Sequence, residues 1–99
     1  MKEDVIHFEK VLNETNELYQ ELNHVLKKIE KNRKAYQSLK EYYQSEEYLK
    51  DVKKSDETKE YDSIPCGVLS QDEVFDLIGE VYQTSIQMLE VATKVLKEH

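Results

Sequence analysis

Residues 8–29 read FEKVLNETNELYQELNHVLKKI, and this stretch decides the fold. Its apolar side chains recur at alternating steps of four and three, the heptad repeat of helices that pack along one face. A second apolar row flanks the first and widens the stripe beyond a two-stranded seam. The main row runs through Phe8, Leu12, Thr15, Tyr19, Leu22, Leu26, Ile29, Arg33, Tyr36, Lys40 and Tyr43. The sequence therefore predicts one long amphipathic helix over residues 3–43.

The composition also favours an all-α fold. The chain has 99 residues with 2 glycines, 1 proline and no tryptophan, so it lacks the turn residues that a sheet of many strands needs. The hydrophobic share of 38% is low and predicts a thin core. A chain of this length can form one hydrophobic core. We therefore expect one helical domain over residues 1–99 and exclude a two-domain enzyme.

A strong helix-start signal lies in the last third of the chain. Ser70 is a suitable N-cap, and Glu73 stands three residues later, where a capping box needs it. Leu69 and Val74 occupy the two positions of a hydrophobic staple. An apolar stripe at helical spacing follows this start. The sequence predicts a second long helix over residues 71–97.

A short helix and a polar loop are expected between the two long helices. Ser45 is a suitable N-cap, and Glu46 and Glu47 place negative charge in the first helical turn, where the helix dipole favours it. The residues that follow are polar and rich in turn formers. We predict a helix over residues 46–54 and a loop over residues 55–69.

The charge distribution favours an antiparallel hairpin of the two long helices. Residues 3–21 hold six acids and one base, whereas residues 27–40 hold six bases and one acid. The last helix is acidic at its start and basic near its end. Antiparallel packing therefore sets unlike charges side by side.

The two helices differ in length, which leaves an overhang. About 41 helical residues span roughly 62 Å and about 27 span roughly 41 Å. If the hairpin closes near Tyr43 and Ser70, the N-terminal end of the first helix stays uncovered. We expect a second copy to cover this end and form a homodimer through Val5, Phe8, Val11 and Leu12. The alternative is a break in the first helix between Asn13 and Asn16, with the N-terminal piece folded back on a monomer.

The net charge and the single cysteine restrict the cellular compartment and the classes of partner that we expect. Lys and Arg total 14 and Asp and Glu total 21, which gives a net charge of −7 that repels a nucleic-acid backbone. No apolar run reaches the length of a membrane span, and the first residues are acidic where a signal peptide is basic. Cys66 is the only cysteine, so no internal disulfide forms. We expect a cytoplasmic protein that binds neither membranes nor nucleic acid directly.

Two stretches resemble a known family. YYQSEEYLKD, residues 42–51, and CGVLSQDEVFDLI, residues 66–78, are similar to the bacterial family catalogued as domain of unknown function 4298. The matching residues are Tyr42, Tyr43, Ser45, Tyr48, Leu49, Asp51, Gly67, Val68, Leu69, Ser70, Asp72, Phe75, Asp76 and Leu77. The chain departs from the family's usual residue at Tyr48, which is aromatic like the usual Trp, and at Cys66 and Gln71, where the family usually has Arg and Glu. The resemblance covers about the last 60 residues, and it implies a small helical protein of Gram-positive bacteria and their mobile elements, without an established activity.

Tyrosine is unusually frequent, with seven residues, and five of them lie around the connection. Tyrosine suits both a core and an interface because its body is apolar and its tip is polar. We assign Tyr43, Tyr48 and Phe75 to the core that closes the hairpin. The predicted contacts with a partner are Tyr42, Tyr61, Glu46, Glu47 and Asp51.

No residues form a recognisable catalytic or metal-binding motif. The spacing of Asp4 to His7 and of Glu21 to His24 is that of di-iron bundles, but the two pairs lie about 25 Å apart along one helix and cannot share a site. Acids of the second and third predicted helices are expected to converge near the closed end, yet most of them already serve helix starts. These acids are Glu46, Glu47, Asp51, Asp72, Asp76 and Glu80. We predict no catalytic residue, no cofactor and no metal.

The leading functional hypothesis is a non-enzymatic interaction or regulatory protein. It self-associates through the first helix and presents the tyrosine-rich, acidic connection to a protein partner that the sequence does not identify. An alternative is an acidic inhibitor from a mobile element, which mimics phosphate charge and occludes a nucleic-acid-binding protein. A third alternative is a metal-dependent activity at the acidic cluster.

Overall fold

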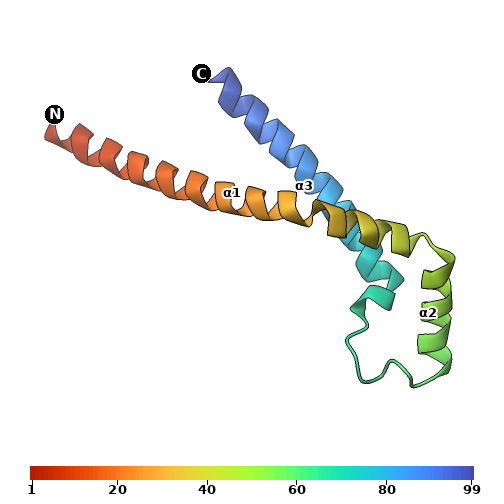
Figure 1. The fold of residues 1–99 in the computed structure, drawn as a ribbon. Helices are drawn as coiled ribbons and strands as arrows, with labels where there is room; N and C mark the ends of the chain where they lie inside the picture. The colour runs from red at the N-terminus through yellow and green to blue at the C-terminus, as the bar shows by residue number, and fades with distance from the viewer. The chain divides into compact units, whose positions relative to one another are not determined.

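The computed structural model describes all residues, 1–99. The helices follow one another as α1, Lys2–Tyr43, α2, Glu46–Glu57, and α3, Gln71–Lys97, with the short 3-10 turn η1, Gly67–Leu69, before α3 (Figure 1). There is no β-strand. The chain divides into two compact units, Met1–Ser38 and Leu39–His99. The predicted all-α class, with its long first and last helices, is confirmed.

Helix α1 is continuous through its most polar segment. The Thr15 hydroxyl donates to the Val11 carbonyl at 2.8 Å, so this side chain satisfies its hydrogen bonding within the helix. Glu3 and Asp4 in the first turn suit the positive end of the helix dipole. The predicted alternative, a break between Asn13 and Asn16, is therefore wrong.

Unit 1, residues 1–38, is a single stretch of helix. No residue of α1 is buried. Phe8 is 63% exposed and Leu12 is 54% exposed, and the other large apolar residues between Val5 and Ile29 are exposed as well. Nothing within unit 1 packs against its apolar stripe, because a lone helix has no second element to cover it.

Helix α2 begins at the predicted cap and ends later than predicted. Ser45 Oγ accepts a hydrogen bond from the Tyr48 N–H at 3.2 Å. At the other end, the N–H and the hydroxyl of Thr58 both donate to the Lys54 carbonyl, at 3.0 and 2.8 Å, which holds the last turn. The predicted loop over 55–69 is corrected at both ends: its first three residues belong to α2 and its last three form η1.

Helix α3 has the predicted bounds and only half of the predicted capping box. Ser70 Oγ accepts from the Glu73 N–H at 3.3 Å, which confirms the N-cap. The Ser70 N–H donates to the Gly67 carbonyl at 3.0 Å, because η1 directly precedes the cap, so it does not bind the Glu73 side chain. That carboxylate instead lies over Gly67, where a Cβ would stand 2.8 Å from Glu73 Oε2.

The core of unit 2, residues 39–99, is small and partly aromatic. Tyr48 is 1% exposed and Val74 is 4% exposed. The Tyr48 ring packs edge-on against Tyr42 and Tyr43, with ring centroids 5.2 Å apart in both pairs. Helix α3 and α2 both contact η1. The core assignment is confirmed for Tyr48.

The core assignment is wrong for Phe75, which is 68% exposed. Neighbouring residues of a helix point about 100° apart, so the turn of α3 that buries Val74 directs Phe75 outward. Tyr43 is half-buried and also serves as a donor, because its hydroxyl contacts the Gln71 carbonyl at 3.3 Å.

We expect Ser70→Ala to lower the free energy of unfolding of the chain by about 1 kcal/mol, because it removes the side-chain acceptor at the start of α3. Chemical denaturation followed by circular dichroism measures this loss. The matched control is Ser85→Ala in the middle of α3, where the hydroxyl donates to the Val81 carbonyl at 2.7 Å and alanine is the better helix former. Equal stability of the two variants would contradict the capping role.

Candidate functional site

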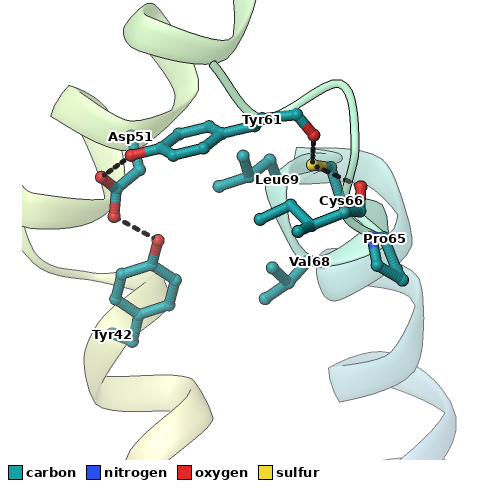
Figure 2. A pocket seen from close by; sticks show the side chains of 8 residues that line it. Tyr42, Asp51, Tyr61, Pro65, Cys66, Val68 and Leu69 are labelled. Carbon is teal, nitrogen blue, oxygen red and sulfur yellow. Dashed lines mark hydrogen bonds between the residues drawn. The ribbon is translucent and has the colours of Figure 1, made fainter.

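A small pocket lies in unit 2, at the connection between α1 and α3. Its volume is about 250 Å³. Figure 2 shows Val68 and Leu69 pointing from η1 toward the space beside Tyr42 and Tyr61. The full lining comprises Tyr42, Asp51, Tyr61, Ile64, Pro65, Cys66, Val68 and Leu69. The pocket therefore has one polar wall and one apolar wall.

The polar wall is built on the Asp51 carboxylate. The Tyr42 hydroxyl donates to Asp51 Oδ2 at 2.6 Å, and the Tyr61 hydroxyl donates to Asp51 Oδ1 at 3.1 Å (Figure 2). Tyr42 belongs to the last turn of α1, Asp51 to α2 and Tyr61 to the loop after α2. One carboxylate thus ties three segments together through hydrogen bonds to a charged acceptor, which are stronger than neutral ones.

The electrostatics of this cluster favour neutral phenols. Burial, and then the hydrogen bond to Asp51, raises the pKa of Tyr42 to about 12. The same two causes raise the pKa of Tyr61 above its usual value. Both hydroxyls therefore keep their protons at neutral pH and remain donors to the carboxylate. Neither phenol is prepared to act as a base, since that role needs a lowered pKa.

The cation beside the pocket already has partners. Lys54 Nζ lies 2.9 Å from Glu60 Oε2 and 5.5 Å from the centroid of the Tyr61 ring. The hydrogen bond to Glu60 raises the pKa of Lys54. None of the ion pairs of the chain includes Asp51. The carboxylate is therefore held by the two phenols and not by a lysine.

Cys66 has a structural position in the pocket wall. Its thiol contacts the carbonyls of Tyr61 at 3.3 Å and of Ile64 at 3.2 Å, which are acceptors for a weak S–H donor (Figure 2). The side chain is half-buried. These contacts hold the loop that carries Tyr61 against the turn before η1.

One buried polar group of this region has no hydrogen-bond partner. The Tyr48 hydroxyl is buried and unpaired. Burial, and then the neighbouring Tyr43, raises the pKa of Tyr48, so the phenol stays protonated. An unpaired buried hydroxyl reduces stability, because it loses its hydrogen bonds to water and gains none in the protein.

The structure brings together three of the five predicted partner-contact residues. Tyr42, Asp51 and Tyr61 form one hydrogen-bonded cluster, whereas Glu46 and Glu47 are exposed in the first turn of α2 and do not line the pocket. Sequence reasoning missed the apolar wall. The only signal for it was the Ile-Pro-Cys-Gly run before η1, which indicated a turn but not a pocket.

The acids expected to converge at the closed end form no metal site. No group of three or more His, Cys, Asp or Glu side chains is placed to hold a metal ion. Asp51 is the only acid that lines the pocket, and both of its oxygens accept a phenol hydrogen. These hydrogen bonds hold the segments of the connection together.

The predicted self-association residues lie along one surface of unit 1. Val5, Phe8 and Leu12 line a shallow depression together with polar neighbours, and Val11 beside them is exposed. The polar neighbours include the carboxylates of Asp4 and Glu9. Each helix of the structure is too short or too polar to span a lipid bilayer.

Comparison with known proteins gives one match. The model of a family described as a domain of unknown function (DUF4298) matches residues 5–91. Neither a curated protein nor a solved structure matches the chain. The match extends well beyond the two motifs that carry the resemblance in the sequence, and it confirms that resemblance.

We expect Tyr42→Phe to lower the free energy of unfolding by about 1 kcal/mol at pH 7, because it removes the bond to Asp51. The pKa of Tyr42 is raised in the folded chain, so this bond stabilises fully below pH 10 and is lost as the pH rises toward 12. The difference in free energy of unfolding between wild type and variant should therefore become smaller between pH 10 and pH 12. Urea unfolding at several pH values measures this difference.

The control for Tyr42→Phe is Tyr82→Phe, which changes an exposed tyrosine of α3. A surface substitution of this kind should change stability by less than about 0.5 kcal/mol at each pH. A difference in free energy of unfolding between wild type and Tyr42→Phe that stays constant up to pH 12 would contradict the assigned hydrogen bond to Asp51.

We expect Tyr48→Phe to raise the free energy of unfolding by about 1 kcal/mol, because it removes a buried hydroxyl that has no partner. Thermal unfolding followed by circular dichroism measures the gain. The matched control is Tyr43→Phe, which should lower stability because that hydroxyl donates to the Gln71 carbonyl. A destabilised Tyr48→Phe variant would show that the hydroxyl does have a partner.

Proposed function

Since the chain belongs to the DUF4298 family, whose description states no activity, we propose its function from its surfaces: it is a non-enzymatic interaction protein that self-associates through α1. The observation that carries this proposal is the exposed apolar stripe of unit 1. The pocket supports the non-enzymatic part, because its single acid is held by two protonated phenols.

Exposure of the stripe has a direct energetic cost. Covering a leucine or phenylalanine side chain contributes about 1.5 to 3 kcal/mol, and unit 1 exposes large apolar residues from Val5 to Ile29. Soluble monomers rarely leave a contiguous apolar surface of this extent in water. Association that covers the stripe is therefore strongly favoured over a free helix.

We further propose that α3 packs antiparallel to the C-terminal part of α1 and completes the hairpin. Within unit 2, the Tyr43 hydroxyl donates to the Gln71 carbonyl at 3.3 Å, so the end of α1 and the start of α3 lie side by side. The opposed charge gradients of the two helices favour the same direction of packing. This packing involves only the part of α1 after Ile29, so the hairpin leaves residues 5–29 for self-association.

The connection is the proposed surface for a protein partner. Tyr42 and Tyr61 keep their hydroxyls engaged with Asp51, so the partner is offered ring faces, the apolar pocket wall and the exposed carboxylates of α2. A surface with an apolar centre and a charged rim suits protein recognition.

We expect the wild-type chain to be a dimer by light scattering across a concentration series. The double variant Phe8→Asp with Leu12→Asp should be a monomer, because it places two carboxylates in the apolar surface. Circular dichroism shows whether the double variant remains folded.

The control variant is Lys10→Asp, which changes the net charge by the same two units. Lys10 has a side chain that is 77% exposed and lies 4.0 Å from Glu14, outside the apolar rows. This variant should remain a dimer. A wild-type mass that stays monomeric at every concentration would overturn the proposed self-association.

A further inference from the structure

We propose that the apolar stripe of unit 1 is covered by the same segment of a second copy, with residues 5–29 of the two α1 helices paired antiparallel. Leu12 of each copy then lies opposite Leu22 of the other, and Phe8 lies opposite Leu26. This inference rests on the proposed self-association, and it adds the partner, the direction and the register.

The register follows from the apolar layers. In an antiparallel pair the two residue numbers of every layer have the same sum, so one layer fixes the others. Pairing Leu12 with Leu22 leaves no charged residue in any layer between Val5 and Ile29. The complete set of layers is Val5 with Ile29, Phe8 with Leu26, Leu12 with Leu22, and Thr15 with Tyr19.

The flanking row fits the same register. Val11 then lies near Val25 of the second copy, and Leu18 lies near the second copy's Leu18, at the centre of the pair. All three are exposed in the single chain. Both apolar rows of unit 1 thus find apolar neighbours in one arrangement, and a shift by one heptad in either direction leaves part of residues 5–29 without an apolar partner.

The one polar residue of the layers is already satisfied. The Thr15 hydroxyl donates to the Val11 carbonyl at 2.8 Å inside its own helix. It therefore enters the seam without an unpaired donor, and its methyl group packs against Tyr19 of the second copy. The Tyr19 hydroxyl stands at the end of a long side chain, where it reaches water at the edge of the seam.

Charge alone favours a different register, and the apolar layers decide against it. Sliding the helices until residues 27–40 face the acidic residues 3–21 places Arg33 and Lys40 in the seam. An exposed ion pair stabilises much less than the burial of a leucine or phenylalanine, so the slid register loses more than it gains. Arg33 also has a partner in its own helix, since its guanidinium lies 3.1 Å from Glu30.

Charge does decide the direction of the helices. A parallel pair sets the six acids of residues 3–21 beside the same six acids of the other copy. The antiparallel pair brings Glu3 and Asp4 of one copy to the level of Lys31 of the other. The antiparallel direction thus replaces repulsion along the acidic half by attraction at both ends.

The test is a pair of spin–spin distance measurements on the full chain. One nitroxide is attached at Lys10→Cys and, in a separate protein, at Lys31→Cys, each in a Cys66→Ser background that keeps a hydrogen-bond donor at residue 66. Both positions are exposed, and they occupy the same place in the heptad. In the proposed register, the axial separation between the two copies is about 21 Å at residue 10 and about 42 Å at residue 31, at 1.5 Å per residue.

The expected result is a longer distance at residue 31 than at residue 10. Equal, short distances would indicate a parallel pair, and a longer distance at residue 10 would indicate the register that charge alone favours. Either result overturns the proposed direction and register. If the mass is still that of a dimer, the proposed self-association stands. A monomeric mass for wild type and labelled proteins overturns both.

Discussion

A helix buries side chains only against another element, and unit 1 of this protein has no second element. Isolated helices are marginal in water, and most helical stability in proteins comes from packing an apolar face. The apolar stripe between Val5 and Ile29 is exposed in the single chain, and covering it would stabilise the helix. The proposed assembly, and with it the stability of the first helix, depends on this one constraint.

Unit 2 is stabilised by different interactions. Its core contains only two buried apolar residues, Tyr48 and Val74, so polar contacts have a larger share than in most domains. Asp51 joins three segments through two phenols, and Cys66 and Tyr43 add hydrogen bonds to backbone carbonyls. This is the expected behaviour of a chain too small to build a large core.

Local signals were predictable from the sequence, and contacts between segments were not. The N-caps Ser45 and Ser70 and the bounds of α3 follow from neighbouring residues, and the structure has them. The Asp51 cluster joins residues 9 and 10 positions away across two turns, and no periodicity marks such a meeting. The assignment of Phe75 to the core failed for a related reason: Val74 and Phe75 belong to adjacent apolar rows, and only packing decides which row faces inward.

The two proposed surfaces use separate residues, and this separation has a consequence for regulation. Self-association involves residues 5–29 of unit 1, whereas the connection is fixed by hydrogen bonds within unit 2 that form in a single chain. Binding to the connection therefore does not require the dimer to open. Because association stabilises the folded form of the segment that it covers, the proposed dimer would make the stability of α1 depend on concentration, whereas the shape of the connection would not.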